Sequence, residues 1–256
     1  KQSYILRGEL KLCNYFSCVV TRKLEALWLK TSSSHENIIQ QFKLDDSKLE
    51  DRDFVRIEIL PDNTARLTRD KKDWTLYVDE MDTLPDWFTK AQNQAEAKCW
   101  SAWKESVDIQ LALGQEERTF KDVGIGYAYD SAKVFAYDNV TVEAYDNATI
   151  RAYGNATVRA YGDANVRAHG NVTVEVYDNA TVEAYDNAAV EAHDNATVRA
   201  HDNATVRASA NATVEAYDNV TVEAYNNAAV EAYNNVAVEA YNKATVRAHG
   251  NVTVRA

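Results

Sequence analysis

The residues of this chain that could do chemistry are few, and their spacing matches no catalytic arrangement. His35 is the single histidine before residue 129, and His35-Glu36-Asn37 lacks the second histidine of a helical zinc site. Acidic pairs such as Asp45-Asp46 and Asp79-Glu80 stand in polar segments where carboxylates are normally solvated, and no spacing makes them an acid–base couple. We therefore expect no catalytic, cofactor-binding or metal-binding residues and no enzyme, with His35 at the surface or capping a helix.

The three cysteines, Cys13, Cys18 and Cys99, are irregularly spaced. An odd number without a repeating interval does not indicate a disulfide framework, so we expect free structural thiols ahead of a Cys13–Cys18 disulfide or a zinc site. Free thiols slightly favour a cytoplasmic location, with a cell surface or a virion as alternatives. No run of ~18 apolar residues occurs, as a transmembrane helix would require, so no membrane association is expected.

The composition changes sharply near residue 129. All five Trp and both Pro precede residue 125, whereas the chain after Tyr129 consists mainly of Ala, Val, Thr, Asn, Asp, Tyr, Glu and Arg. We expect a small α+β domain at 1–104, a transition that caps the repeats at 105–128, and a repeat domain at 129–256. The net charge of −11 comprises −3 before Tyr129 and −8 after it. Direct binding to nucleic acid is not expected of such an acidic chain.

The first domain shows mixed helix and strand patterns. Alternating apolar and charged residues predict a strand over Arg52–Leu60, followed by a turn at Pro61-Asp62-Asn63. Ser32-Ser33-Ser34 can cap a short helix over His35–Phe42. Further strands are expected at Tyr4–Leu10, within Lys11–Leu29, at Ala65–Thr68 and at Trp74–Val78.

A longer helix is expected after Leu84-Pro85, with Asp86 as its N-cap. Apolar residues then recur every four positions, which is typical of one buried helix face. Aromatic stripes of this kind usually pack in a core, here on the predicted sheet or on the end of the repeat domain. The stripe consists of Ala91, Ala95, Cys99, Trp103 and Val107, with Trp100 beside it.

The residues from Trp100 to Ala128 change gradually into the repeats. Val107, Ile109 and Leu111 alternate with polar residues, and Val123 and Ile125 follow. This pattern predicts an irregular first coil whose larger apolar residues cap the repeat domain. No such change occurs toward the last octad, so we expect an open C-terminal coil. Its unpaired backbone groups would be covered by further chain or, as we prefer, by a second copy bound end to end.

From Tyr129 the chain divides into sixteen octads without an insertion. The consensus is Tyr, Asp, Asn, Ala, Thr, Val, Glu or Arg, and Ala, as in Tyr145–Ala152. Positions four, six and eight are apolar, and positions five and seven are mostly polar, which is the period-two pattern of a strand. Positions two and three carry Asp, Asn or Gly in nearly every octad, and these residues tolerate left-handed backbone angles in turns.

Two architectures fit strands of about six residues joined by two-residue turns. In antiparallel hairpins the residues that flank each turn share a face, yet positions one and four fall on opposite faces here. A parallel β-solenoid removes the conflict, because each octad keeps positions four, six and eight inside and equivalent residues stack ~4.8 Å apart. The expected fold is thus an α+β domain followed by an all-β parallel solenoid. Its core column at position six is Val142, Val158, Val174, Val190, Val206, Val222, Val238 and Val254.

Charge and volume bear on the number of octads per coil. Position seven is Glu or Arg in octads two to sixteen. Opposite charges occur there in 5 of 14 pairs of adjacent octads, in 9 of 13 pairs two octads apart and in 10 of 12 pairs three octads apart. Opposite charges favour neighbouring rungs, so a coil holds two or three octads. Because Ala and Val fill only a thin interior, we expect two octads per coil, with three as the alternative.

Position one presents an external aromatic ladder, with Tyr or His in every octad except that of Ser209. Stacked rings attract at rung spacing, and Asn at position three can form amide ladders. Asp at position two is expected to form turns, in preference to a calcium site. The tyrosines of this possible interaction surface are Tyr137, Tyr145, Tyr153, Tyr161, Tyr177, Tyr185, Tyr217, Tyr225, Tyr233 and Tyr241.

The octads resemble repeats in uncharacterised proteins of bacteria and their prophages. In those proteins a small front domain with a Leu-Pro-Asp-Trp element precedes the repeats, and Leu84-Pro85-Asp86-Trp87 matches that element. The resemblance implies a bacterial or prophage origin and a solenoid. It implies no activity.

The sequence therefore predicts a non-catalytic structural or interaction protein, in which a rigid repeat rod presents a small head. We expect it to bind itself end to end or to bind another protein, without a cofactor. One alternative is an acidic mimic of nucleic acid that acts as an inhibitor, although Arg at position seven interrupts the acidic surface that it would need. Another is a glycan-binding module that uses the external Tyr and Asn ladders.

Overall fold

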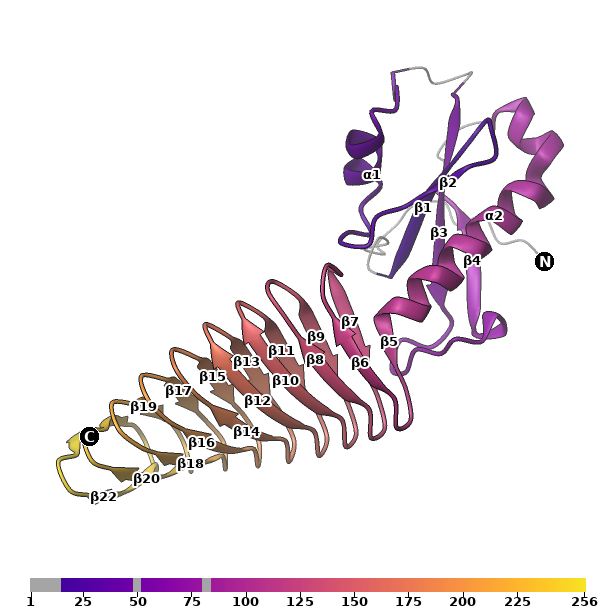
Figure 1. The fold of residues 1–256 in the computed structure, drawn as a ribbon. Helices are drawn as coiled ribbons and strands as arrows, with labels where there is room; N and C mark the ends of the chain where they lie inside the picture. Colours follow the sequence, from indigo (N-terminus) through magenta and orange to yellow (C-terminus); the bar gives the residue numbers. More distant parts are fainter. Residues whose placement is uncertain (1–14, 48–51, 80–83) are drawn as a thin grey trace. The chain divides into compact units, whose positions relative to one another are not determined.

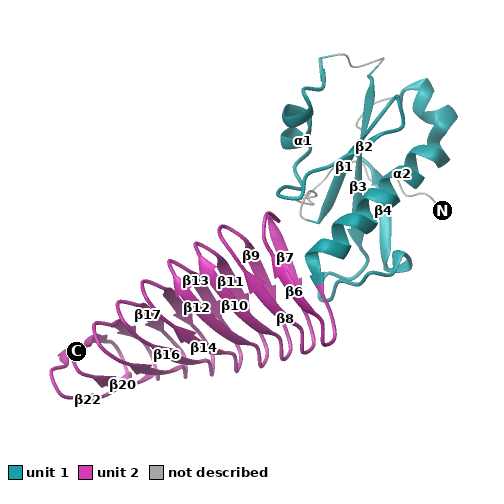
Figure 2. Ribbon diagram, in the orientation of Figure 1, with its two compact units in different colours: residues 1–111 teal, residues 112–256 magenta. Residues whose placement is uncertain are grey.

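The computed structural model describes residues 15–47, 52–79 and 84–256. The chain forms two compact units, residues 1–111 and 112–256 (Figure 2). The strand expected at Tyr4–Leu10 and the residue Cys13 lie outside the described residues. Each unit buries apolar side chains of its own.

The first unit contains a four-stranded antiparallel sheet in the order β2-β1-β3-β4 (Figure 1). The strand expected at Ala65–Thr68 is wrong: Leu67 is buried, but its segment only bends through the connection to the 3-10 helix η1 (Lys71–Asp73). The chain reverses there, and the next segment pairs with β3, with Ile57 opposite Val78. The strands are β1 (Phe16–Thr21), β2 (Ala26–Leu27), β3 (Phe54–Pro61) and β4 (Trp74–Val78).

Helix α1 (His35–Phe42) begins where the sequence predicts. The hydroxyl of Ser34 accepts a hydrogen bond from the backbone N–H of Asn37 at 3.3 Å, which satisfies a donor of the first turn. Ile38 packs with Val19 of β1 and Phe54 of β3 in one buried cluster. Helix α1 therefore covers the sheet face to which Phe54 belongs.

Helix α2 (Asp86–Gln110) covers the opposite face. Cys99 contacts Cys18 of β1. Cys18 and its neighbour Val19 point to opposite faces of the sheet, because side chains alternate along a strand. The Trp103 ring also lies 5.4 Å from the ring of Trp74 in β4. The expected packing on the sheet is confirmed. The buried residues of the predicted stripe are Ala95, Cys99, Trp103 and Val107.

Two details of α2 differ from expectation. The N-cap is Pro85, whose extended backbone (φ −59°, ψ 141°) precedes the first helical residue, so Asp86 lies in the first turn. There its carboxylate lies near the positive end of the helix dipole. The helix also continues through Gln110, so Val107 and Ile109 are helical and do not begin a coil. A spacing of two over so few residues was too short a pattern to distinguish strand from helix.

The second unit, all of which the structure describes, is a parallel β-solenoid of about nine turns built from two sheets (Figure 1). The nine-stranded sheet contains β6 (Glu117–Phe120), β8 (Lys133–Ala136), β10 (Thr149–Gly154), β12 (Asn165–Gly170), β14 (Thr181–Ala184), β16 (Thr197–Ala200), β18 (Thr213–Ala216), β20 (Ala229–Tyr233) and β22 (Thr245–His249). The ten-stranded sheet contains β5 (Leu111–Ala112), β7 (Ile125–Ala128), β9 (Thr141–Ala144), β11 (Thr157–Ala160), β13 (Thr173–Val176), β15 (Ala189–Ala192), β17 (Thr205–Ala208), β19 (Thr221–Ala224), β21 (Ala237–Ala240) and β23 (Thr253–Arg255).

Paired residues lie 16 positions apart, so each coil holds two octads, as predicted. Val158 pairs with Val142 on one side and with Val174 on the other, and all three are fully buried. The predicted core column continues in register to Val254. Val254, in the last described strand, is 43 % exposed, so its expected burial is wrong.

The corners of the coil take more residues than the sequence suggested. Most strands span only positions five to eight, and positions one to four form a turn, as in the 3.2 Å hydrogen bond from Ala148 N–H to the Tyr145 carbonyl. The expected six-residue strands are therefore too long. The turn requires a left-handed residue at position two, where φ is positive in every octad. These residues are Asp130, Asp138, Asp146, Gly154, Gly162, Gly170, Asp178, Asp186, Asp194, Asp202, Ala210, Asp218, Asn226, Asn234, Asn242 and Gly250.

The aspartates at position two also connect successive coils. The Asp146 carboxylate accepts a hydrogen bond from the backbone N–H of Asp130, one coil earlier, at 3.1 Å, and Asp186 accepts from Gly170 at 2.9 Å. Asparagines at position three form the predicted amide ladders, for example Asn171 to Asn155 at 3.3 Å. The polar corner residues thus form turns and join rungs.

The first coil carries larger apolar residues than the repeats, as predicted. Phe120 at position eight is fully buried opposite Ala136. Its ring occupies the space of a missing side chain: a Cβ on Gly126 would lie 2.3 Å from Phe120 Cδ2. Gly126 pairs with Val142 and so stands at the start of the valine column. A large residue at position eight is thus accommodated by glycine at position six.

We expect Ala210→Gly and Ala210→Asp both to stabilise the solenoid. Ala210 has φ 56°, which costs about 1–2 kcal/mol for an L-residue other than Asn or Asp. Glycine removes that strain but is more flexible when unfolded, which leaves a net gain of about 0.5–1 kcal/mol. Aspartate tolerates the angle and adds an acceptor for the Asp194 N–H. Chemical denaturation should show both gains, whereas the control Ala212→Gly, at a buried position without a left-handed angle, should lose about 1 kcal/mol.

We expect Gly126→Val alone to destabilise the chain by about 1–3 kcal/mol, because its side chain overlaps the Phe120 ring. Phe120→Ala alone should also destabilise it, through a cavity. The double variant recreates the consensus residues at positions six and eight, so its loss should be smaller than the sum by at least about 1 kcal/mol. Strictly additive losses in denaturant titrations would contradict the proposed complementarity.

Candidate functional site

The predicted aromatic ladder exists as two columns, because alternate octads lie in different sheets. Within each column, rings one coil apart stack with centroids 4.7–5.5 Å apart and interplanar angles of 4–13°. One column contains Tyr129, Tyr145, Tyr161, Tyr177, His193, Tyr225 and Tyr241, with Ser209 hydrogen-bonded to His193. The other contains Tyr137, Tyr153, His169, Tyr185, His201, Tyr217, Tyr233 and His249.

Stacking determines what the rings can offer to a partner. The faces of an inner ring such as Tyr145 are covered by Tyr129 and Tyr161 at 4.9 and 5.1 Å. Such rings are half-buried and present only their edges and hydroxyl groups. Recognition of sugars uses open aromatic faces, which these inner rings lack.

The charged side chains at position seven pair with the next coil and with the tyrosines. Arg207 lies 3.0 Å from Glu223, and the same Glu223 oxygen accepts a hydrogen bond from the Tyr225 hydroxyl at 2.8 Å. Residues i, i+16 and i+18 thus form an Arg–Glu–Tyr network. Further Arg–Glu pairs between coils are Arg159–Glu175, Arg167–Glu183, Arg199–Glu215 and Arg255–Glu239, at 2.7–3.4 Å.

These contacts shift the pKa values of the network. Hydrogen bonds from Tyr225 and Arg207 lower the pKa of Glu223. The hydrogen bond to Glu231, together with desolvation, raises the pKa of Tyr233 to about 12. Tyr233 therefore stays a protonated donor and Glu223 an ionised acceptor across the neutral range.

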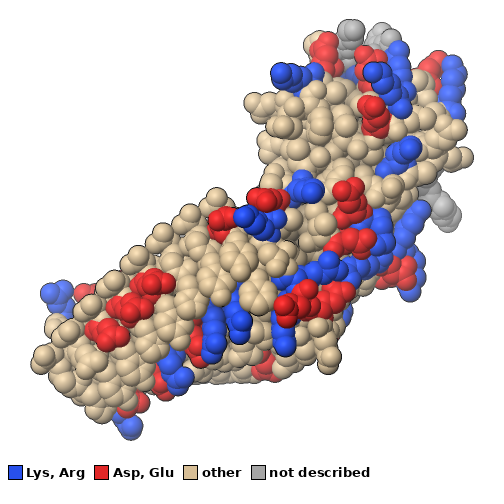
Figure 3. All heavy atoms as spheres, viewed as in Figure 1, with Lys and Arg blue, Asp and Glu red and all other residues tan. Residues whose placement is uncertain are grey.

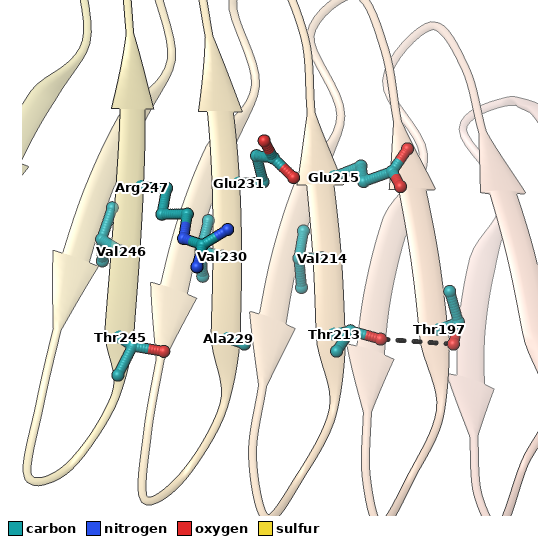
Figure 4. Close-up of a pocket in the computed structure, with 10 residues that line it drawn as sticks. All are labelled: Thr197, Thr213, Val214, Glu215, Ala229, Val230, Glu231, Thr245, Val246 and Arg247. Atoms are coloured by element: carbon teal, nitrogen blue, oxygen red, sulfur yellow. Dashed lines mark hydrogen bonds between the residues drawn. The ribbon is translucent and has the colours of Figure 1, made fainter.

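Shallow grooves follow the rows of side chains at positions five and seven. In Figure 4, Thr245, Thr213 and Thr197 form one row and Arg247, Glu231 and Glu215 another, with the buried Val214 and Val230 between them. The Thr197 and Thr213 hydroxyl oxygens lie 3.3 Å apart. Similar grooves lie over other coils of both sheets. The groove is therefore a product of the repeat.

The surface charge of the second unit is mixed. Acidic and basic side chains both occur along the face of the solenoid seen in Figure 3. The Arg–Glu pairs between coils produce this mixture. A continuous acidic surface, as a nucleic-acid mimic needs, does not extend along the paired rows.

The first unit departs from the expectation for His35. The residue is buried, not at the surface, and the sequence could not show this because α1 covers the charged side of β3. His35 Nδ1 lies 3.5 Å from Asp79 Oδ2 and 4.0 Å from Glu58 Oε1. Sequence reasoning missed this cluster, since Glu58 alternates with apolar residues and looks like a solvent-facing position. The sequence signal is limited to the placement of two ligand-type residues, since His35 begins the predicted helix and Asp79 follows the predicted strand Trp74–Val78.

The other site expectations fall as follows. Cys18 and Cys99 are free and buried, and burial together with contact with Cys99 raises the pKa of the Cys18 thiol. No helix within residues 15–47, 52–79 and 84–256 is long and apolar enough to cross a membrane. No protein-family model, curated protein or solved structure matches the chain, so no residue acquires a role from a relative.

We expect the solenoid to lose stability at both ends of the pH scale. The raised pKa of Tyr233 contributes stability that is complete below pH about 10 and is lost as the pH rises through about 12. The lowered pKa of Glu223 contributes stability that is present above pH about 4.5 and is lost as the pH falls through its folded value. Thermal unfolding between pH 3 and 12 measures both limits.

A matched pair of variants assigns the alkaline limit. The difference in absorbance at 295 nm between the wild type and Tyr233→Phe reports the ionisation of Tyr233. Its midpoint should lie near pH 12. Glu231→Gln should move that difference toward pH 10, because an amide oxygen is a weaker acceptor than a carboxylate. An unchanged midpoint in Glu231→Gln would contradict the network.

Proposed function

We propose that this chain is a non-catalytic structural or interaction protein whose second unit serves as a rigid rod. The observation that carries the proposal is that the external side chains bind side chains of the neighbouring coils. Rings stack on rings, Arg pairs with Glu, Glu accepts from Tyr, and Asn and Asp join successive coils. These polar and aromatic groups, which an enzyme would use to bind a substrate, here bind the neighbouring coil. Such contacts between coils stiffen the solenoid.

The proposed partner is a second copy of the chain, bound end to end. Strands β22 and β23 each have a neighbour on one side only. Val254 is 43 % exposed, whereas Val238, one coil earlier in the same column, is 1 % exposed. An edge with open backbone groups and an apolar inner surface fits another such edge, and a two-fold axis would let the same residues meet.

The two alternatives have less support. An acidic mimic of nucleic acid needs one sign of charge, and pairs such as Arg207–Glu223 and Arg199–Glu215 place both signs on each sheet. A glycan-binding role for the ladders needs open ring faces, which inner rings such as Tyr161 lack between Tyr145 and Tyr177. A bacterial or prophage origin, as the octads suggest by resemblance, is part of the same proposal. Co-purification of bound proteins from the native host would test whether the chain binds itself or another protein.

Light scattering at several protein concentrations tests the association. The mass of the wild-type chain should rise from monomer toward dimer with concentration. Val254→Lys should remain monomeric, because a charge at the open edge opposes strand pairing. Thr205→Lys, on the exposed outer side of an inner coil, should associate like the wild type. A wild-type chain that is monomeric at all concentrations refutes end-to-end binding.

A further inference from the structure

Three side chains that commonly ligate metals converge inside the first unit. His35 is the first residue of α1, Glu58 lies within β3, and Asp79 directly follows β4. One ligand atom from each lies within 4.8 Å of the other two. The side chains of His35 and Glu58 are 2 % and 1 % exposed, and that of Asp79 is 15 % exposed. The cluster is therefore enclosed except on the Asp79 side.

The orientation of the imidazole ring is defined by its other nitrogen. His35 Nε2 lies 3.2 Å from the carbonyl oxygen of Ile57. A carbonyl oxygen only accepts hydrogen bonds, so Nε2 carries the proton and donates it. Nδ1 then faces the two carboxylates. Histidines that bind metals usually hold their second N–H on a backbone carbonyl or a carboxylate in this way.

The distances are close to those between the ligands of one metal ion. Nδ1 lies 3.5 Å from Asp79 Oδ2 and 4.0 Å from Glu58 Oε1, beyond the ~2.7–2.9 Å of a charge-assisted N–H···O bond. Neighbouring ligands of a tetrahedral Zn²⁺ ion with bonds of about 2.0–2.1 Å lie about 3.4 Å apart. The first distance already fits, and the second requires a contraction of roughly half an ångström.

We propose that His35 Nδ1, Glu58 and Asp79 bind one divalent transition-metal ion of the Zn²⁺ class. A water molecule that enters from the Asp79 side would complete a tetrahedral shell. The site departs from the expectation that the first unit holds no metal-binding residues. It would join α1 to β3 and to the end of β4. Helix α1 also contacts β3 through the packing of Ile38 on Phe54 and through the hydrogen bond from His35 to Ile57.

The surrounding backbone supports a preformed site. Ser34 caps α1 and so fixes the position of His35. Glu58 lies in a strand with partners on both sides, opposite Ser17 and Tyr77. The Asp79 N–H donates to the Arg56 carbonyl at 2.9 Å, which extends the β3–β4 pairing by one residue. Little ordering remains for the ion to cause, which favours affinity.

Metal binding to the full chain tests the proposal. The protein is freed of metal with a chelator and titrated with Zn²⁺ in competition with a chromophoric chelator, and thermal unfolding is recorded with and without Zn²⁺. We expect one tight ion per chain and a rise in Tm, because an ion that binds only the folded state stabilises it. Co²⁺ in its place should give the visible absorption of a tetrahedral site.

Variants locate the ion. Asp79→Asn and Glu58→Gln should each weaken Zn²⁺ binding at least tenfold and abolish the rise in Tm. The control Asp86→Asn alters a carboxylate that is 96 % exposed in the same unit and should bind like the wild type. Circular dichroism establishes that each variant is folded. A wild-type chain with no tight ion and no change in Tm overturns the proposal, and so does a tight ion that the folded Asp79→Asn and Glu58→Gln variants retain.

Discussion

A left-handed residue at position two of every octad is the constraint on which the solenoid depends. It turns the chain through each corner, so that position four of the same octad points inward again. Two such corners return the chain above itself after 16 residues, with Val on Val and Ala on Ala. Each buried valine then contributes about 1.5–3 kcal/mol. Without the corner the same strands would expose their apolar face.

The corner also explains the polar chemistry outside. Because every coil repeats the last one, equivalent positions lie one rung apart. A side chain there meets either the same residue type or a residue that replaces it at the equivalent position. Identical Tyr and Asn residues tolerate this, since rings stack and amides both donate and accept. Identical charges do not, and Arg and Glu therefore alternate at many rungs. Many of the external side chains therefore interact with the neighbouring coil.

The first unit follows a different logic. Its sheet is covered on both faces, so the charged side of β3 is enclosed along with the apolar side. Glu58 is 1 % exposed although it alternates with Ile57 and Ile59, which face α2. A buried carboxylate is costly unless a cation or donors compensate it. In the site proposed above, an ion bound by His35 Nδ1, Glu58 and Asp79 would supply that compensation.

The sequence by itself determined the features that depend on local pattern. Positions one and four of the octad fall on opposite faces of a strand, which excluded hairpins. The charges at position seven and the small interior indicated two octads per coil. Ser34 marked the start of α1. These inferences held because each residue meets a copy of its own environment one coil away, so local periodicity there is also tertiary structure. The columns at Val142 and Tyr145 could be assigned from spacing alone.

Only the tertiary structure decided the contacts between unlike segments. Nothing local shows that Ala65–Thr68 bends while Trp74–Val78 pairs with β3, because pairing depends on which segment the intervening turn returns to the sheet. Nothing local shows that Phe120 fills the space left by Gly126, or that α1 buries His35 against Glu58 and Asp79. Such contacts join residues far apart in the chain, and their chemistry appears only when the elements pack.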